Sequence, residues 1–262
     1  MMRVGIGGWT YEPWRGLFFP EKLPKTQELS HASRRVTSIE VNGTFYSIFT
    51  PSTFQRWAAE TPDDFIFSLK APRFAVNRRV LAEAGPSIEK FFGSGVAELK
   101  SKLGPILWQL APTKKYDSGD IAAFLALLPK TIDGLKLRHA LEVRNESFRS
   151  EDFIAQVREA GVAVVLADSE KYPLIADFSA DFVYARLQNA KADLETGYGA
   201  EALDTWATLA RGWERGEEPE QFPLAAPRGH ALKSRDVFIY FINGAKERAP
   251  AAAEALIRRW KN

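Results

Sequence analysis

The sequence predicts an α/β protein with a TIM-barrel-like (β/α)8 fold, formed as one domain over residues 1–262. Eight short runs of β-branched and aromatic residues alternate with helical segments along the chain. The composition, 45% hydrophobic and 26% charged, is that of an average soluble globular domain. No linker, repeat or low-complexity tract divides the chain. An open, doubly wound sheet of eight strands is the competing arrangement.

The expected strands are short apolar runs that end in polar residues. They span residues 3–8, 38–42, 65–70, 106–110, 139–144, 163–168, 182–188 and 237–243. The expected helices have a proline near their first turn, a glycine at their end, or apolar residues spaced three and four apart. They span residues 51–60, 87–102, 151–160, 200–212 and 250–261, with a short earlier helix around His31. Residues 189–198 and 212–229 are expected to form long loops.

Composition excludes several classes of site. The chain has no cysteine, so disulfides, thiolate zinc sites and cysteine nucleophiles are excluded. Its net charge of +2 is too small to indicate a nucleic-acid-binding protein by itself. No signal-peptide pattern precedes Trp9, and no apolar run approaches the ~18 residues of a membrane span. We therefore expect a cytoplasmic protein without a membrane partner.

Polar side chains gather at the ends of the predicted strands. Residues two apart share a face of a strand, and in seven of the eight runs the last residues of one face are polar. Because active sites of barrel enzymes lie at the carboxyl ends of the strands, these residues predict a functional rim. The rim consists of Glu40, Asn42, Lys70, Gln109, Glu142, Arg144, Asp168, Arg186, Gln188 and Asn243.

Aromatic residues in the adjoining loops form a second candidate feature. Trp9, Tyr11 and Trp14 follow the first predicted strand, Tyr46 follows the second, and Tyr198 lies beyond the seventh. Flat aromatic faces at such a mouth suit a sugar ring or a nucleobase. The alternative for each of them is ordinary core packing under a long loop.

The rim also has a purely structural interpretation. Its three carboxylates and three cations balance, so they can neutralise one another as an ion-pair network that plugs the barrel. Histidine chemistry is not expected, because His31, His139 and His230 do not reach the rim. No G-x-S-x-G motif marks a serine nucleophile.

Several motifs, taken together and in order, resemble the YecE-like family, a family of unknown function. The matching segments are GWTY (8–11), WRG (14–16), FP (19–20), EVNGTFY (40–46), FSLK (67–70), LGPILWQL (103–110), EVRNESF (142–148), YAR (184–186) and DVFIYF (236–241). The resemblance implies a TIM-barrel-like fold and a relation to sugar isomerases. Two departures weaken any histidine-dependent chemistry: Gln188 stands where the family usually has histidine, and Asn145 stands where histidine often follows Glu-x-Arg.

The first functional hypothesis is an enzyme related to sugar isomerases that acts on a small polyhydroxylated or phosphorylated substrate. Glu142 or Glu40 would be the general base and Lys70 the acid or electrostatic stabiliser. Arg144 and Arg186 would bind an anionic group of the substrate, and Trp9 and Tyr46 would stack on its ring. The remaining rim residues and aromatics would line the binding site.

A single Mg²⁺ or Mn²⁺ is a further option for this enzyme, with Glu40, Glu142 and Asp168 as its oxygen ligands. The second hypothesis, from a different class, is a nucleotide or single-stranded nucleic-acid binding protein without turnover, favoured by aromatics among arginines. The third is a scaffold whose rim is structural.

Overall fold

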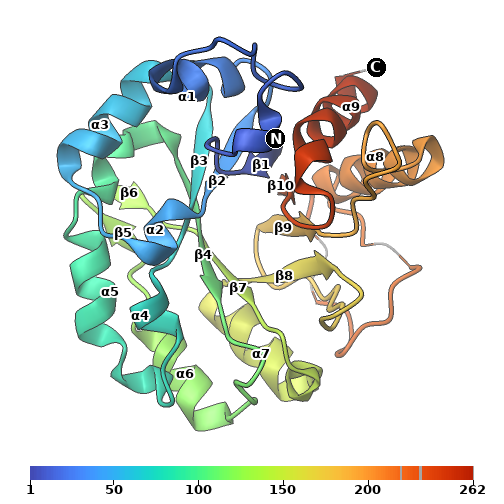
Figure 1. Ribbon diagram of the computed structural model, residues 1–262. Helices are drawn as coiled ribbons and strands as arrows, with labels where there is room; N and C mark the ends of the chain where they lie inside the picture. The colour runs from blue at the N-terminus through green and yellow to red at the C-terminus, as the bar shows by residue number, and fades with distance from the viewer. Residues whose placement is uncertain (219, 230–231, 262) are drawn as a thin grey trace.

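Eight parallel strands close into a barrel in the computed structural model, which describes residues 1–218, 220–229 and 232–261 (Figure 1). The order around the barrel is β1-β2-β3-β4-β7-β8-β9-β10 and back to β1. The strands are β1 (Met2–Gly7), β2 (Ser38–Val41), β3 (Ile66–Lys70), β4 (Leu103–Gln109), β7 (His139–Glu142), β8 (Ala163–Asp168), β9 (Phe182–Leu187) and β10 (Asp236–Phe241). Each corresponds to a predicted strand, so the predicted barrel is confirmed and the open sheet is excluded.

Helices surround the barrel (Figure 1). They are α1 (Glu28–Ala32), α2 (Gly43–Tyr46), α3 (Pro51–Glu60), α4 (Arg73–Val76), α5 (Gly85–Phe92), α6 (Ser118–Ala126), α7 (Glu151–Ala160), α8 (Ala200–Glu214) and α9 (Ala249–Lys261). Single-turn 3₁₀ helices are η1 (Glu12–Trp14), η2 (Lys25–Gln27), η3 (Leu81–Glu83), η5 (Glu146–Phe148) and η6 (Lys246–Arg248). No helix among these is both long and apolar enough to cross a bilayer.

The structure differs from the predicted elements in several places. The predicted helix 87–102 is divided into α5 and a 3₁₀ segment, η4 (Val96–Lys102), because Gly95 adopts a φ of 100° between them. The sequence analysis did not identify the short helices α2 and α4, the helix α6, or the two-stranded hairpin of β5 (Thr131–Ile132) and β6 (Leu135–Lys136). Helix α8 continues two residues beyond the predicted helix 200–212.

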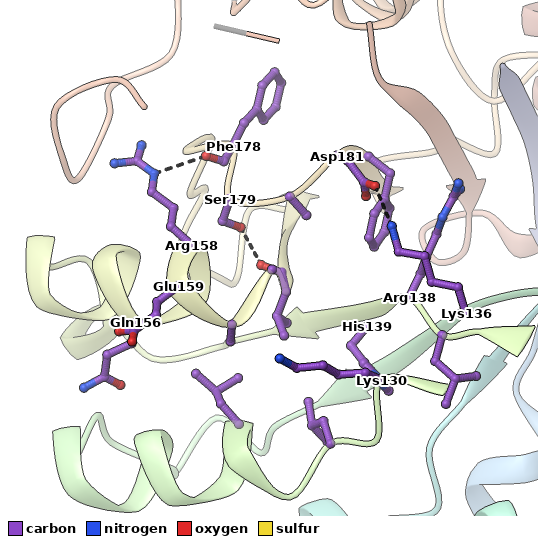
Figure 2. A pocket seen from close by; sticks show the side chains of 18 of the residues that line it. Lys130, Lys136, Arg138, His139, Gln156, Arg158, Glu159, Phe178, Ser179 and Asp181 are labelled. Carbon is purple, nitrogen blue, oxygen red and sulfur yellow. Dashed lines mark hydrogen bonds and ion pairs between the residues drawn. The ribbon is translucent and has the colours of Figure 1, made fainter. Parts of the chain in front are cut away.

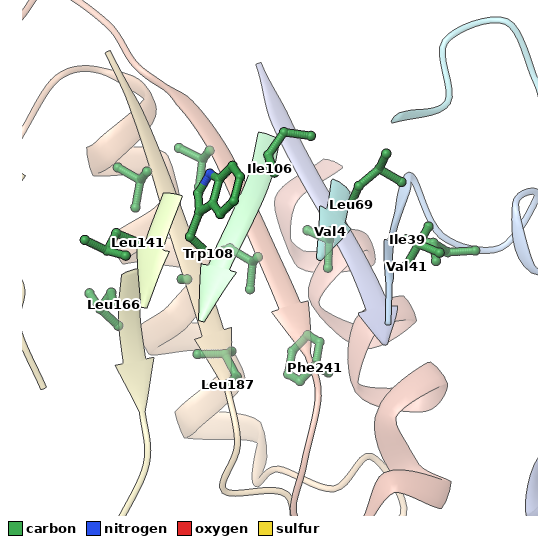
Figure 3. Packing of buried hydrophobic residues seen from close by; sticks show 14 of the residues in the cluster. Val4, Ile39, Val41, Leu69, Ile106, Trp108, Leu141, Leu166, Leu187 and Phe241 are labelled. Carbon is green, nitrogen blue, oxygen red and sulfur yellow. The ribbon is translucent and has the colours of Figure 1, made fainter. Parts of the chain in front are cut away.

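The hydrophobic core consists of two layers separated by the strands. Outward-facing side chains pack between the strands and the helices, as for Val4, Leu69, Trp108 and Phe241 in Figure 3. Inward-facing side chains fill the lumen in a separate cluster that includes Leu107, Ala140, Ala163, Val165, Phe182, Tyr184, Phe238, Tyr240 and Ile242. Strands β8 and β10 are therefore apolar on both faces along most of their length, as expected for a parallel barrel.

The middle of the lumen is already partly polar. The Tyr184 hydroxyl lies 2.8 Å from the Ser68 hydroxyl, and the Tyr240 hydroxyl lies 2.7 Å from that of Ser38. Small residues opposite the two tyrosines leave room for the rings, and a Cβ on Gly5 would lie 2.0 Å from the carbonyl oxygen of Ser38. These hydrogen bonds offset the cost of burying hydroxyl groups below the mouth.

Candidate functional site

Five strands place a polar side chain in the last lumen-facing layer of the barrel. The residues are Glu40 on β2, Lys70 on β3, Gln109 on β4, Glu142 on β7 and Arg186 on β9. Each lies two residues beyond a lumen residue of the middle layer, so strand alternation brings all five to one end of the barrel. All five are buried, and this layer of polar side chains forms the floor of the mouth.

Arg186 is the centre of this layer. Its Nε and Nη2 donate to the two carboxylate oxygens of Glu40, each at 3.0 Å, and its Nη1 donates to Glu142. Burial opposes the charged guanidinium, but the carboxylates of Glu142 and Glu40 outweigh burial and raise the pKa of Arg186. All three guanidinium nitrogens of Arg186 therefore donate to carboxylates within the protein.

The two glutamates are also saturated with donors. Tyr184 donates to Glu40 at 2.7 Å. Glu142 accepts from Gln109 at 2.8 Å and from Arg144 Nε at 2.9 Å. Burial alone would raise the pKa of Glu142, yet Arg186 and Arg144 hold it below its ordinary value. A carboxylate stabilised in this way is a weak general base, which disfavours the base role predicted for Glu142.

Lys70 differs from its neighbours because it lacks a partner. Its side chain is only 7% exposed, and among the described residues its Nζ forms no hydrogen bond and no ion pair. The ammonium lies 4.2 Å from the centre of the Phe45 ring. Burial, followed by repulsion from Arg186, lowers the pKa of Lys70 to about 8, against the attraction of Glu40 and Glu142.

The rim also contains an unpaired amide. Gln188 directly follows β9, two residues beyond Arg186, and is 8% exposed. Its Oε1 accepts from Asn243 at 3.2 Å, whereas its Nε2 is buried without a partner among the described residues. An unpaired buried donor costs free energy unless another group accepts its hydrogen bond.

Arg144 lies at the edge of the mouth under an aromatic residue. Its guanidinium carbon is 4.2 Å from the ring centre of Tyr172, and its Nη1 donates to the Tyr172 hydroxyl at 3.3 Å. The sequence analysis did not single out Tyr172, although it is an aromatic residue in the loop after β8. It also passed over Tyr184, whose signal was its position two residues before Arg186 on the same strand face.

The predicted Mg²⁺ or Mn²⁺ site of Glu40, Glu142 and Asp168 is not formed. Asp168 shares the face of Val164 and Leu166, which pack toward the helices, and its carboxylate accepts from Asn189 at 2.9 Å. Burial raises the pKa of Asp168. The described residues contain no group of three or more His, Asp or Glu side chains arranged to hold a metal. The alternation of β8 therefore separates Asp168 from the floor of the mouth.

Without Asp168, the charges at the mouth do not balance. Glu40 and Glu142 supply two negative charges, and Lys70, Arg144 and Arg186 supply three positive charges, which leaves +1 when Lys70 is protonated. The predicted self-neutralising network is present around Arg186, but Lys70 is outside it.

The aromatic residues divide into core and surface groups. Trp14 is fully buried and donates to the carbonyl of Lys246, and Tyr198 is buried against Phe241, so both are corrected to core residues. Tyr11 packs edge-to-face on Trp14. Tyr46 is 67% exposed.

Trp9 and Asn42 follow β1 and β2, and Trp9 packs edge-to-face on Trp57 of α3 and on the outward-facing Phe67, so it lies on the helix side of the barrel. They help to line a hollow of about 530 Å³, whose wall includes Gly43, Phe49 and Trp57. The Asn42 Nδ2 donates to Glu40 Oε1 at 3.3 Å. This hollow is therefore connected to the ion-pair network through Asn42.

Neither described histidine reaches the mouth. His31 lies in α1 against the carbonyl of Phe18, 3.0 Å away. His139 begins β7, so it lies at the opposite end of the barrel, where it borders a groove of about 910 Å³ with Arg138 and Arg158 (Figure 2). His139 Nδ1 accepts from Trp108, and burial lowers the pKa of His139 to about 4. His230 lies outside the described residues.

A family-level sequence pattern described as "Protein of unknown function DUF72" matches residues 3–262. The UPF0759 protein YecE of Escherichia coli O157:H7 is 24% identical over 177 residues, a match that spans 64% of this chain and 60% of the relative. This chain therefore covers less than two thirds of that relative's length.

Two solved structures share the fold. A DUF72 family protein from Thermotoga maritima is similar with a TM-score of 0.76 at 19% identity, covering all of both chains. A xylose isomerase-like TIM barrel/4-hydroxyphenylpyruvate dioxygenase fusion protein is similar with a TM-score of 0.51 at 14% identity, covering 98% of this chain and 42% of the other. At these identities the similarity establishes the fold alone.

Proposed function

This chain belongs to the DUF72 family of proteins of unknown function, and we propose that it is an enzyme whose substrate is small, polyhydroxylated and anionic. The substrate would bind at the carboxyl ends of the barrel strands, where barrel enzymes bind theirs. The name of the xylose isomerase-like neighbour fits a sugar-like substrate.

The observation that carries the proposal is two polar groups without protein partners among the described residues, the Lys70 ammonium in the floor of the mouth and the Gln188 amide just beyond it. Every carboxylate of the floor is paired, whereas one ammonium group and one amide donor are not. Buried polar groups without partners are expensive for a fold to keep, and they concentrate at binding sites. An anionic or hydroxyl-rich ligand supplies the acceptors that these groups lack.

The same geometry assigns roles to the surrounding residues. Arg144 would bind the anionic group, Lys70 would contact the neighbouring part of the substrate, and the Gln188 amide would donate to a substrate oxygen. The exposed Tyr46 would flank the substrate ring. Glu40 and Glu142 would hold Arg186 and Arg144 in place rather than abstract a proton, because their oxygens are already bonded.

A thermal-shift panel tests the proposal. Sugar acids, sugar phosphates, neutral sugars, nucleotides and short single-stranded DNA would be compared at low and high salt. A ligand at about 100 times its Kd adds about 2.7 kcal/mol, which is several degrees in Tm for a domain of this size. We expect sugar acids or sugar phosphates to raise Tm, and the rise to disappear in Gln188→Leu.

The panel also separates the alternatives. A shift produced only by nucleotides or DNA and lost between about 50 and 200 mM salt would support the nucleic-acid-binding alternative instead. No shift with any ligand class would contradict the proposal and leave the ion-pair network as a structural plug.

A further inference from the structure

Lys70 has the features required of an amine nucleophile. Such a lysine needs an uncharged amino group, a nitrogen lone pair free of hydrogen bonds, and access for a small molecule. Lys70 lies in the last lumen-facing layer of β3, where the mouth opens, and no described residue hydrogen-bonds to its Nζ.

The charged groups that face Lys70 act in both directions, and burial is the largest cause of its lowered pKa. Arg186 on β9 and Arg144 after β7 repel its proton, whereas Glu40 on β2 and Glu142 on β7 attract it. Both carboxylates form ion pairs with arginines, so the positive charge of those arginines offsets much of the carboxylates' attraction for the Lys70 proton. The Phe45 ring stabilises the protonated ammonium through a cation–π contact, but it is not a conventional hydrogen-bond acceptor. Burial then lowers the pKa of Lys70 to about 8.

Building on the proposed function, we propose that the Lys70 amine forms an imine with the carbonyl carbon of a small anionic aldehyde or ketone bound at the mouth. The Nζ lone pair attacks the carbonyl carbon and forms a C–N bond. The carbonyl oxygen takes up the two protons of the amine and leaves as water, so the products are a C=N bond and one water molecule.

Arg144 accounts for the anionic part of this substrate class. Its guanidinium lies at the edge of the same mouth, with its Nε on Glu142 and its Nη1 on Tyr172. Its Nη2 makes no hydrogen bond within the described part of the chain. A carboxylate or phosphate on Nη2 would bring the adjoining carbonyl carbon toward the floor of the mouth, where Lys70 lies.

Reductive trapping tests the imine. The protein would be incubated with glyoxylate and cyanoborohydride at about pH 7, digested, and its lysines mapped by mass spectrometry against time. At this pH a lysine with a pKa of about 8 is uncharged roughly 200 times more often than one with the ordinary pKa of about 10.4. We expect Lys70 to be carboxymethylated first, and faster than exposed lysines by up to that factor.

Lys102 provides an internal control of equal burial. It is 8% exposed, and its Nζ donates to the carbonyls of Ala58 and Thr61. We expect no early label on Lys102. In Lys70→Arg, which keeps the positive charge and removes the amine, the early label should disappear while slow labelling of exposed lysines continues.

Two results distinguish this inference from the proposed function. If glycerol phosphate, which has no carbonyl group, raises Tm but Lys70 is labelled no faster than exposed lysines, the imine is refuted and the proposed binding site stands. If no anionic ligand raises Tm and Lys70 is not labelled, both proposals fail. Preferential labelling of Lys70 supports the imine in either case.

Discussion

Two buried lysines in this protein have nearly the same exposure but opposite surroundings. Lys102, at the end of η4, donates to the Ala58 carbonyl at 2.6 Å and to the Thr61 carbonyl at 2.8 Å, so it satisfies acceptors at the C-terminal end of α3. Lys70, at the mouth of the barrel, has an aromatic ring beside it and no acceptor among the described residues.

The comparison indicates that burial alone does not distinguish a structural ion from a functional one. Both side chains lose the hydration of their ammonium group, and only Lys102 recovers hydrogen bonds in exchange. The folded protein therefore keeps a desolvated ammonium group at Lys70 that no hydrogen bond to a described residue compensates, as is typical of binding and catalytic groups. The same contrast separates Arg186, which is saturated, from the unpaired amide of Gln188.

The largest effect is expected at the saturated centre of the mouth. Arg186→Met leaves the carboxylates of Glu40 and Glu142 buried with fewer partners, and should lower the free energy of unfolding by about 3–5 kcal/mol. Urea denaturation followed by circular dichroism measures the loss. The triple variant with Glu40→Gln and Glu142→Gln should recover much of it, because the uncompensated charges are then removed. A single variant as stable as the wild type would show that the network is not a structural unit.

At Lys70 the prediction concerns pH. The folded protein releases the Lys70 proton near pH 8, whereas the unfolded chain keeps it to about pH 10.4. The unfolded state therefore binds more protons in this window, so the free energy of unfolding should rise with pH, by up to about 3 kcal/mol. In Lys70→Met this rise should be absent. Urea denaturation of both proteins from about pH 7.5 to 10.5 measures the difference, and parallel pH profiles would contradict the unpaired state of Lys70.

At neutral pH, replacing Lys102 should lower the free energy of unfolding, whereas replacing Lys70 should not. Lys102→Met removes charged hydrogen bonds to the carbonyls of Ala58 and Thr61, and should destabilise the protein by about 2 kcal/mol. Lys70→Met removes an unpaired buried cation, and should leave stability unchanged or raise it. The Tm values of the two variants at about pH 7 test this directly. Equal losses in both would show that Lys70 is as structural as Lys102.

The smallest effect on stability is expected at Gln188. Gln188→Leu removes an unpaired donor and one hydrogen bond from Asn243, so the free energy of unfolding should change by less than about 1 kcal/mol. Its stabilisation by anionic ligands should nevertheless be lost. Asn243→Ala, which removes only the partner of Oε1, is the matched control. If Gln188→Leu destabilises the protein strongly without ligand, the amide is part of the fold.

The sequence was sufficient to predict the barrel and most of its lumen layer. The predicted helices 51–60 and 151–160 have the bounds of α3 and α7, because proline at the start and glycine at the end are local signals. Glu40, Lys70, Gln109, Glu142 and Arg186 were predicted to share one end of the barrel, since alternation along a strand is also local. Where a strand has few polar residues, as in β8, the same reasoning placed Asp168 on the wrong face.

The sequence by itself determined most of the residues that reach the mouth, because strand periodicity and chain order indicate the face and the end of each strand. Only the tertiary structure decided which of these residues bond to one another. Arg186 binds two carboxylates from β2 and β7, and Lys70, on the strand next to β2, binds neither. Pairing depends on distances of a few ångströms between strands that are far apart in the sequence, and periodicity along one strand carries no information about those distances.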